Sequence, residues 1–126
     1  MRKHGILNAQ LAGLLARLGH TDAVVVADCG LPVPAHVPVA DLALVFGVPR
    51  FSDVLAALLA ELEVEGVTVA DQAPQAVHDL IPEDVEIITE VDHEDLKDMV
   101  AGAAFVVRTG ETTPYANAIL HCGVPF

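Results

Sequence analysis

The chain has 126 residues, of which 53% are hydrophobic, and a formal net charge of −12 with only six Lys and Arg residues. This charge disfavours nucleic acids and anionic membranes as partners, and the shortage of cations favours a neutral ligand over a phosphorylated one. No apolar run reaches the roughly 18 residues of a membrane span. We therefore expect one globular domain over residues 1–126, with surplus apolar surface buried between subunits.

The cellular compartment is predicted from two features. Arg2, Lys3 and His4 lead into a patterned helix rather than an apolar signal segment. Cys29 and Cys122 form no recognisable disulfide framework. Both observations predict a cytoplasmic protein.

The first elements are a helix and a buried strand. Leucines recur at helical spacing between residues 7 and 18, with Asn8 as the expected N-cap and Gly19 as the expected residue after the C-cap. The apolar run 24–26 is typical of a central strand in a parallel sheet. A Pro-rich segment, 31–38, predicts a rigid loop.

The rest of the chain alternates between patterns typical of strands and patterns typical of helices. Apolar runs predict strands over 42–46, 67–70, 85–88, 104–107 and 117–122. Helical spacing predicts helices from Pro49 to Leu62, from Pro74 to Leu80, and from the cap Asp92 to the residue before Gly102, with Leu96, Met99 and Val100 inward. This alternation predicts an α/β fold, a single layered domain with a mostly parallel central sheet flanked by helices.

Two polar residues flank the first strand. Asp28 follows its carboxyl end, where ligands bind in open α/β sheets. His20 precedes its other end, and such a stretch spans roughly 20–25 Å. If both residues serve one site, we expect that site to be shared between subunits.

Each candidate residue has two interpretations. His20 either caps the carbonyls of the preceding helix or acts as a general acid/base, because an imidazole titrates near neutrality. Asp28 either caps the turn that follows it or accepts hydrogen bonds from ligand hydroxyls. His93 is more simply a solvated residue at a helix start than a ligand-binding imidazole. Tyr115-Ala116-Asn117 either lines a sugar pocket or forms a turn with a buried tyrosine.

The sequence predicts no cofactor or metal site. The glycines form neither a dinucleotide fingerprint nor a phosphate loop, and no His or Cys pair has metal-binding spacing. The remaining histidines are expected at surface or interface positions: His4, His36, His78 and His121.

Several blocks, in order along almost the whole chain, closely resemble the D-ribose pyranase family, which also includes L-fucose mutarotases. The blocks are His4-Gly5-Ile6-Leu7-Asn8, Leu18-Gly19-His20-Thr21-Asp22, Ala27-Asp28-Cys29-Gly30-Leu31-Pro32, Asp41-Leu42-Ala43-Leu44, His93-Glu94-Asp95-Leu96-Lys97, Arg108-Thr109-Gly110-Glu111 and Pro114-Tyr115-Ala116-Asn117. The first and third blocks favour the ribose branch. The segment between Ala70 and Val91 matches no family signature, and His121 departs from the family pattern.

The resemblance implies a cofactor-independent isomerase that interconverts the pyranose and furanose forms of free D-ribose. It implies His20 as the proton donor and Asp28, His93, Tyr115, Ala116 and Asn117 as substrate contacts. It also implies a ring-shaped homo-oligomer, a decamer of two stacked pentamers, with sites between subunits. The alternatives are a mutarotase of another free monosaccharide such as L-fucose, and a non-catalytic sugar-binding protein.

Overall fold

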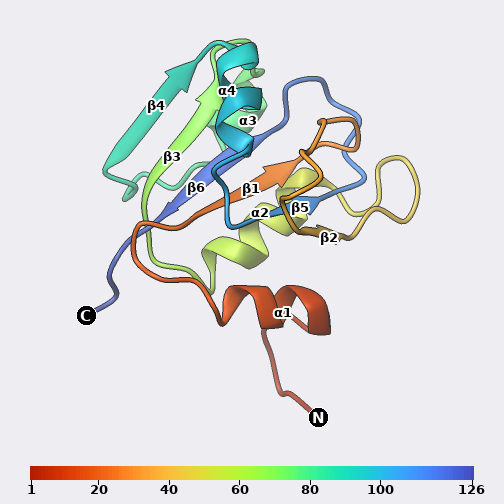
Figure 1. The fold of residues 1–126 in the computed structure, drawn as a ribbon, viewed down its shortest axis with the longest axis vertical. Helices are drawn as coiled ribbons and strands as arrows, with labels where there is room; N and C mark the ends of the chain where they lie inside the picture. The colour runs from red at the N-terminus through yellow and green to blue at the C-terminus, as the bar shows by residue number, and fades with distance from the viewer.

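A six-stranded sheet runs through the computed structural model, which describes residues 1–126 (Figure 1). The strands are β1 (Ala23–Ala27), β2 (Val39–Asp41), β3 (Val64–Ala70), β4 (Ile87–Val91), β5 (Phe105–Arg108) and β6 (Ala118–Cys122). Their order is β2-β5-β1-β6-β3-β4, and β6 alone runs antiparallel to its neighbours. The predicted α/β fold with a mostly parallel sheet is confirmed.

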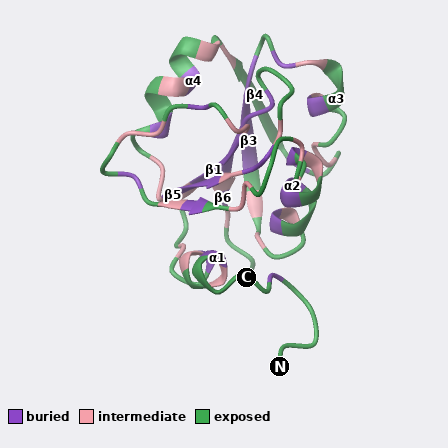
Figure 2. Cartoon of the chain, turned by 90° about the vertical axis from the view of Figure 1, so that its right-hand side faces the viewer, coloured by how far each residue is buried: buried purple, intermediate pink, exposed green.

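Helices cover both faces of the sheet. They are α1 (Ala9–Leu15), α2 (Phe51–Leu59), α3 (Gln75–His78) and α4 (His93–Val100). Figures 1 and 2 place α4 on one face and α2 and α3 on the other. Because successive strand residues point to opposite faces, Val25 of β1 packs with α4, whereas Val24 and Val26 pack with α2. None of the helices is long and apolar enough to cross a membrane.

The first helix begins where the sequence predicts and ends earlier. The Asn8 side chain accepts a hydrogen bond from the Leu11 N–H, which confirms the predicted N-cap. The helix ends at Leu15, and the N–H groups of Arg17 and Leu18 bond to carbonyls three residues back. The C-cap is Ala16, so the prediction that Gly19 follows the C-cap is wrong.

The prediction of a buried strand over 42–46 is also wrong. Strand β2 precedes this segment and ends at Asp41, whose Oδ1 accepts a hydrogen bond from the Ala43 N–H and turns the chain away from the sheet. Leu44 and Phe46 are 77% and 84% exposed, at the tip of the resulting loop. Apolar composition alone could not distinguish this exposed loop from a core strand.

Other element boundaries shift by a few residues. The fourth strand is β4, Ile87–Val91, because Val85 closes a turn back to Pro82. The helix predicted from Pro49 to Leu62 is α2, which begins at Phe51 and ends at Leu59. Met99 of α4 is half-exposed rather than inward-facing.

The Glu111 carboxylate joins the loop after β5 to the start of α2. It accepts hydrogen bonds from the Phe51 N–H at 3.1 Å and from Thr112 and Thr113. Partial burial alone would raise the pKa of Glu111, but the hydrogen bonds from Phe51, Thr113 and Thr112 outweigh it and hold the pKa below its ordinary value of 4.5.

Replacing Glu111 with glutamine should lower the free energy of unfolding by about 1 kcal/mol at neutral pH, because an amide cannot accept all of these bonds. A lowered pKa stabilises the folded state above the unfolded-state pKa, and this contribution is lost as pH falls through the folded-state value. The difference between wild type and Glu111→Gln, measured by urea unfolding, should therefore shrink below pH 4.5. Glu86→Gln, an exposed control, should show no such trend.

Candidate functional site

Asp28 and Asn117 meet at the carboxyl end of β1. The Asp28 N–H donates to Asn117 Oδ1 at 2.8 Å, and Asn117 Nδ2 donates to Asp28 Oδ2 at 3.0 Å. Asp28 Oδ1 also accepts from the Gly30 N–H, so the predicted turn cap is present. Asn117 is fully buried, immediately before β6, whereas Asp28 is partly exposed. The pair presents a fixed carboxylate at the carboxyl end of β1, which suits sugar hydroxyls.

His93 and Tyr115 lie together at the same end of the sheet. Their ring centroids are 4.9 Å apart in an edge-on arrangement. Tyr115 has a φ of 63°, a left-handed conformation that is uncommon for a bulky residue and is concentrated at functional sites. The Nδ1 atom of His93 is buried without a hydrogen-bond partner in the chain. An unpaired buried nitrogen is costly, which favours a ligand or a neighbouring subunit as its partner.

Between these pairs, Ala116 serves a packing role. It is buried and joins the hydrophobic core on the α2 side of the sheet. Its N–H donates to the Thr113 carbonyl. The Tyr115-Ala116-Asn117 segment is therefore a turn, as one interpretation predicted, but its tyrosine is 38% exposed rather than buried.

Gln72 positions His93, and the sequence did not reveal it. Gln72 follows β3; its Oε1 accepts from the His93 N–H and its Nε2 donates to Asp92 Oδ2. Hydrogen bonds from the Glu94 N–H and from Gln72 lower the pKa of Asp92. The Gln72–His93 contact spans 21 residues of sequence, and no local pattern could have indicated it.

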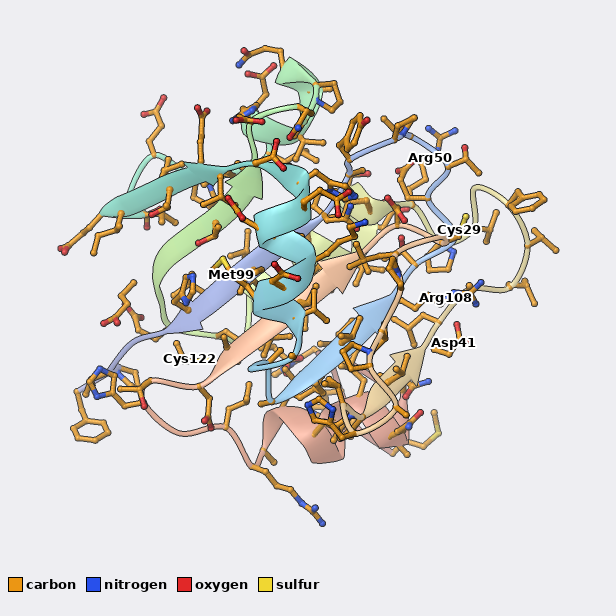
Figure 3. All side chains as sticks on the ribbon, turned by 45° about the horizontal axis from the view of Figure 1, so that its top comes forward. Cys29, Asp41, Arg50, Met99, Arg108 and Cys122 are labelled. Carbon is orange, nitrogen blue, oxygen red and sulfur yellow. The ribbon has the colours of Figure 1, made fainter.

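Arg108, which belongs to one of the family blocks but had no predicted role, is a second positioning residue. Its Nε donates to the Cys29 carbonyl at 3.1 Å, and its Nη1 binds both carboxylate oxygens of Asp41. Figure 3 shows Arg108, Cys29 and Asp41 gathered at one end of the sheet. Arg108 thus fastens the loop after Asp28 to the edge strand β2.

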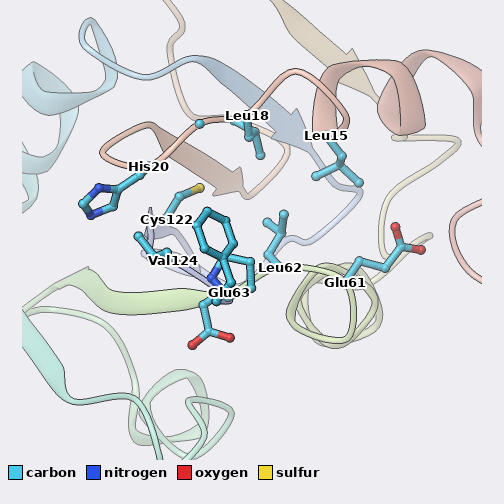
Figure 4. Close-up of a pocket in the computed structure, with 12 residues that line it drawn as sticks. Leu15, Leu18, His20, Glu61, Leu62, Glu63, Cys122 and Val124 are labelled. Atoms are coloured by element: carbon cyan, nitrogen blue, oxygen red, sulfur yellow. The ribbon is translucent and has the colours of Figure 1, made fainter.

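His20 lies at the opposite end of β1. It is on the turn between α1 and β1, and it is one of the residues that line a pocket of about 410 Å³, together with residues of α1, the segment after α2 and the C-terminal segment (Figure 4). The imidazole side chain is 52% exposed, and its Nε2 is 3.7 Å from Glu65 Oε2. His20 forms no hydrogen bond to the end of α1, so nothing supports the capping interpretation.

The structure therefore separates the predicted residues into two groups. One end of the sheet carries the Asp28 group, which consists of Asp28, His93, Tyr115 and Asn117. His20 lies at the other end. The five residues of β1 alone span about 16 Å between them. One chain cannot bring its own His20 to its own Asp28.

His121, on the last strand, has a structural role. His121 Nε2 and the Thr68 hydroxyl are 2.8 Å apart across β6 and β3. Thr68 is buried, so this bond satisfies a polar group within the sheet. No group of three or more His, Cys, Asp or Glu side chains is arranged to hold a metal ion.

The fold, with the Asp28 group at one end of the sheet and His20 at the other, defines an α/β protein suited to a small, neutral, hydroxyl-rich ligand. Residues 1–125 match the model of the RbsD / FucU transport protein family, and the chain belongs to this family.

Relatives match over their full length. The chain is 54% identical to a D-ribose pyranase of Corynebacterium glutamicum and 53% identical to one of Cutibacterium acnes, covering 100% of each sequence. Bacillus subtilis RbsD, solved in complex with D-ribose, superposes with a TM-score of 0.92 at 46% identity, with both chains covered completely. The fucose mutarotase of Streptococcus pneumoniae shares the fold, with a TM-score of 0.79 at 23% identity and coverage of 99% of this chain and 100% of that one.

Proposed function

We propose that this protein is a D-ribose pyranase, an isomerase that interconverts the pyranose and furanose rings of free D-ribose. The observation that carries the proposal is the full-length similarity, at 46% identity, to a structure solved with D-ribose. The net charge of −12 agrees with an uncharged substrate. L-Fucose is less well supported, since the mutarotase relative is only 23% identical and shows a shared fold alone.

The proposed chemistry is two proton transfers as the pyranose ring opens and two as the furanose ring closes. His20 donates a proton to the ring oxygen while the bond from this oxygen to the anomeric carbon breaks. The anomeric hydroxyl gives its proton to a base and becomes a carbonyl oxygen. The neighbouring hydroxyl then attacks this carbonyl carbon and closes the furanose, while the attacking oxygen gives its proton to the now neutral His20 and the carbonyl oxygen takes back a proton from the base. A positioned acid or base contributes typically about 100- to 10,000-fold to such a step.

The second group of residues would bind the sugar. The Asp28 carboxylate, held by Asn117, accepts hydrogen bonds from sugar hydroxyls. The unpaired Nδ1 of His93 supports this residue as a partner of the substrate and as the base for the anomeric proton. The Tyr115 ring, 38% exposed beside His93, offers an apolar surface to the sugar. No cofactor takes part in this scheme.

The proposed assembly is a cytoplasmic ring-shaped homo-oligomer, a decamer of two stacked pentamers. Two observations support self-association: His20 and Asp28 lie at opposite ends of one chain, and large apolar side chains such as Leu44 and Phe46 are exposed. Burying this surface between copies would stabilise an oligomer. Each site would then combine the His20 of one subunit with the Asp28 group of a neighbour.

The function is tested by magnetisation transfer between the pyranose and furanose anomeric signals of the sugar. We expect the protein to accelerate the exchange in D-ribose in proportion to its concentration, and L-fucose exchange to a much smaller extent. Saturable ribose binding without acceleration would instead indicate a non-catalytic sugar-binding protein. Preferential acceleration of L-fucose exchange would reassign the substrate.

A further inference from the structure

Main-chain hydrogen bonds fix the turn that carries His20, but they do not fix the orientation of its imidazole ring. Thr21, with a φ of 76°, donates its N–H to the Cys122 carbonyl, and the Cys122 N–H donates to the Asp22 carbonyl. The Asp22 carboxylate accepts from the Gly19 N–H at 2.8 Å. These bonds lock the main chain to β6. The half-exposed ring of His20 requires a separate partner to hold one orientation.

Glu65 is that partner because β3 is irregular beside it. Val64 pairs with Cys122 and Gly66 with His121, so the register of β3 against β6 shifts at Glu65. Such a bulge re-aims a side chain, and here the Glu65 carboxylate faces the His20 ring. Gly123 packs closely against this point, since a Cβ at Gly123 would lie 3.2 Å from the Glu65 Cβ.

The other acidic groups around His20 are engaged elsewhere or farther away. Glu61 and Glu63 line the same pocket; Glu61 accepts a hydrogen bond from the Ile6 N–H, and Asp22 is occupied by Gly19. Burial, with Asp22 and Glu65 nearby, raises the pKa of the Cys122 thiol, which keeps this group neutral. Glu65 alone among these acidic groups lies within ion-pair distance of the imidazole.

We propose that Glu65 is a positioning residue for His20: its carboxylate holds the Nε2–H and leaves Nδ1 as the nitrogen that protonates the sugar. This inference rests on the proposed ring-opening function. The Nδ1 proton of the imidazolium passes to the ring oxygen, which takes the electron pair of the breaking bond, while the anomeric hydroxyl proton passes to the base. The neutral imidazole that remains keeps its proton on Nε2, hydrogen-bonded to Glu65.

The separation of 3.7 Å is an ion-pair distance rather than a hydrogen bond. Catalytic hydrogen bonds are often long in ligand-free structures and shorten in the substrate complex. A neighbouring subunit over the pocket would also exclude water and strengthen the interaction between the two charges. The same logic orients catalytic histidines elsewhere, where a carboxylate fixes the tautomer.

The test compares Glu65→Ala and Glu65→Gln with Glu63→Ala in the full-length protein. Glu63 lines the same pocket and forms no ion pair with His20, so it is a matched control for charge. Glu65→Ala should lower kcat for ribose exchange about tenfold with little change in KM, the lower end of the effect of losing an orienting partner. Glu65→Gln retains an acceptor oxygen and should recover part of kcat.

A second measurement needs no sugar. Imidazole ¹⁵N chemical shifts of His20 should report the Nε2–H tautomer in wild type and Glu65→Gln, and a mixture of tautomers in Glu65→Ala. If the wild-type protein does not accelerate ribose exchange, the proposed function is wrong. The tautomer measurement still tests the contact between Glu65 and His20 in that case. Unchanged kcat and tautomer in Glu65→Ala, or an equal loss of kcat in Glu63→Ala, would overturn the role of Glu65.

Discussion

Replacing His20 with alanine is expected to slow ribose ring interconversion by about 100- to 10,000-fold, the typical contribution of a positioned general acid. The ring is 52% exposed on a surface turn, so its removal leaves no core cavity and should not change the fold. Ribose affinity should fall much less, because the Asp28 group at the other end of the sheet is intact. Exchange rates from magnetisation transfer and a ribose titration measure the two effects separately.

The matched control for this substitution is His4→Ala. His4 is also an exposed histidine, in the N-terminal segment before α1, and the mechanism does not use it. Its exchange rate should equal that of wild type. A His20→Ala protein that retains wild-type exchange would remove His20 from the chemistry and return it to a structural role.

Asn117→Ala should damage both stability and binding. Asn117 is fully buried, and its loss would leave the Asp28 N–H and one carboxylate oxygen without their partners. Leaving buried polar groups unsatisfied costs about 1–3 kcal/mol, so we expect the free energy of unfolding to fall by about 2–3 kcal/mol. Ribose affinity should fall about tenfold or more, since Asp28 loses the contact that orients it.

Urea unfolding at equal protein concentration measures the first effect, because stability of an oligomer depends on concentration. Thr112→Ala is the control: this side chain is exposed in the same loop, and the Glu111 contact uses its main-chain N–H. Wild-type stability in Asn117→Ala would show that the hydrogen bonds between Asn117 and Asp28 contribute little. Unchanged affinity would remove Asn117 from the binding group.

Strong local patterns predicted most of the fold. The valine run of β1 is buried because its residues alternate between two helix-covered faces, and apolar runs of this kind are typical of such strands. Asn8 and Asp92 cap their helices as their residue types predict. The wrong predictions lie where a hydrogen bond to one side chain sets the path of the chain against the apolar composition of the segment. Asp41 ends β2 and diverts an apolar segment into solvent.

The candidate site was predictable only in part. The sequence placed Asp28 at a strand end and His20 at the opposite end of the same strand, and the structure reproduces both positions. The pairing of Asp28 with Asn117 joins residues 89 positions apart, and no local periodicity encodes such a contact. Gln72 and Glu65 were missed for the same reason, because each acts through a neighbour that only the folded sheet supplies.

The most direct test of the shared site is complementation between two inactive variants. Differently tagged His20→Ala and Asp28→Asn chains are co-expressed, and assemblies that carry both tags are purified. If each site takes its histidine and its aspartate from different subunits, about a quarter of the sites in randomly mixed rings regain both groups, and exchange should recover to about that fraction of wild type. Mixed assemblies as inactive as either variant alone would contradict a site shared between subunits.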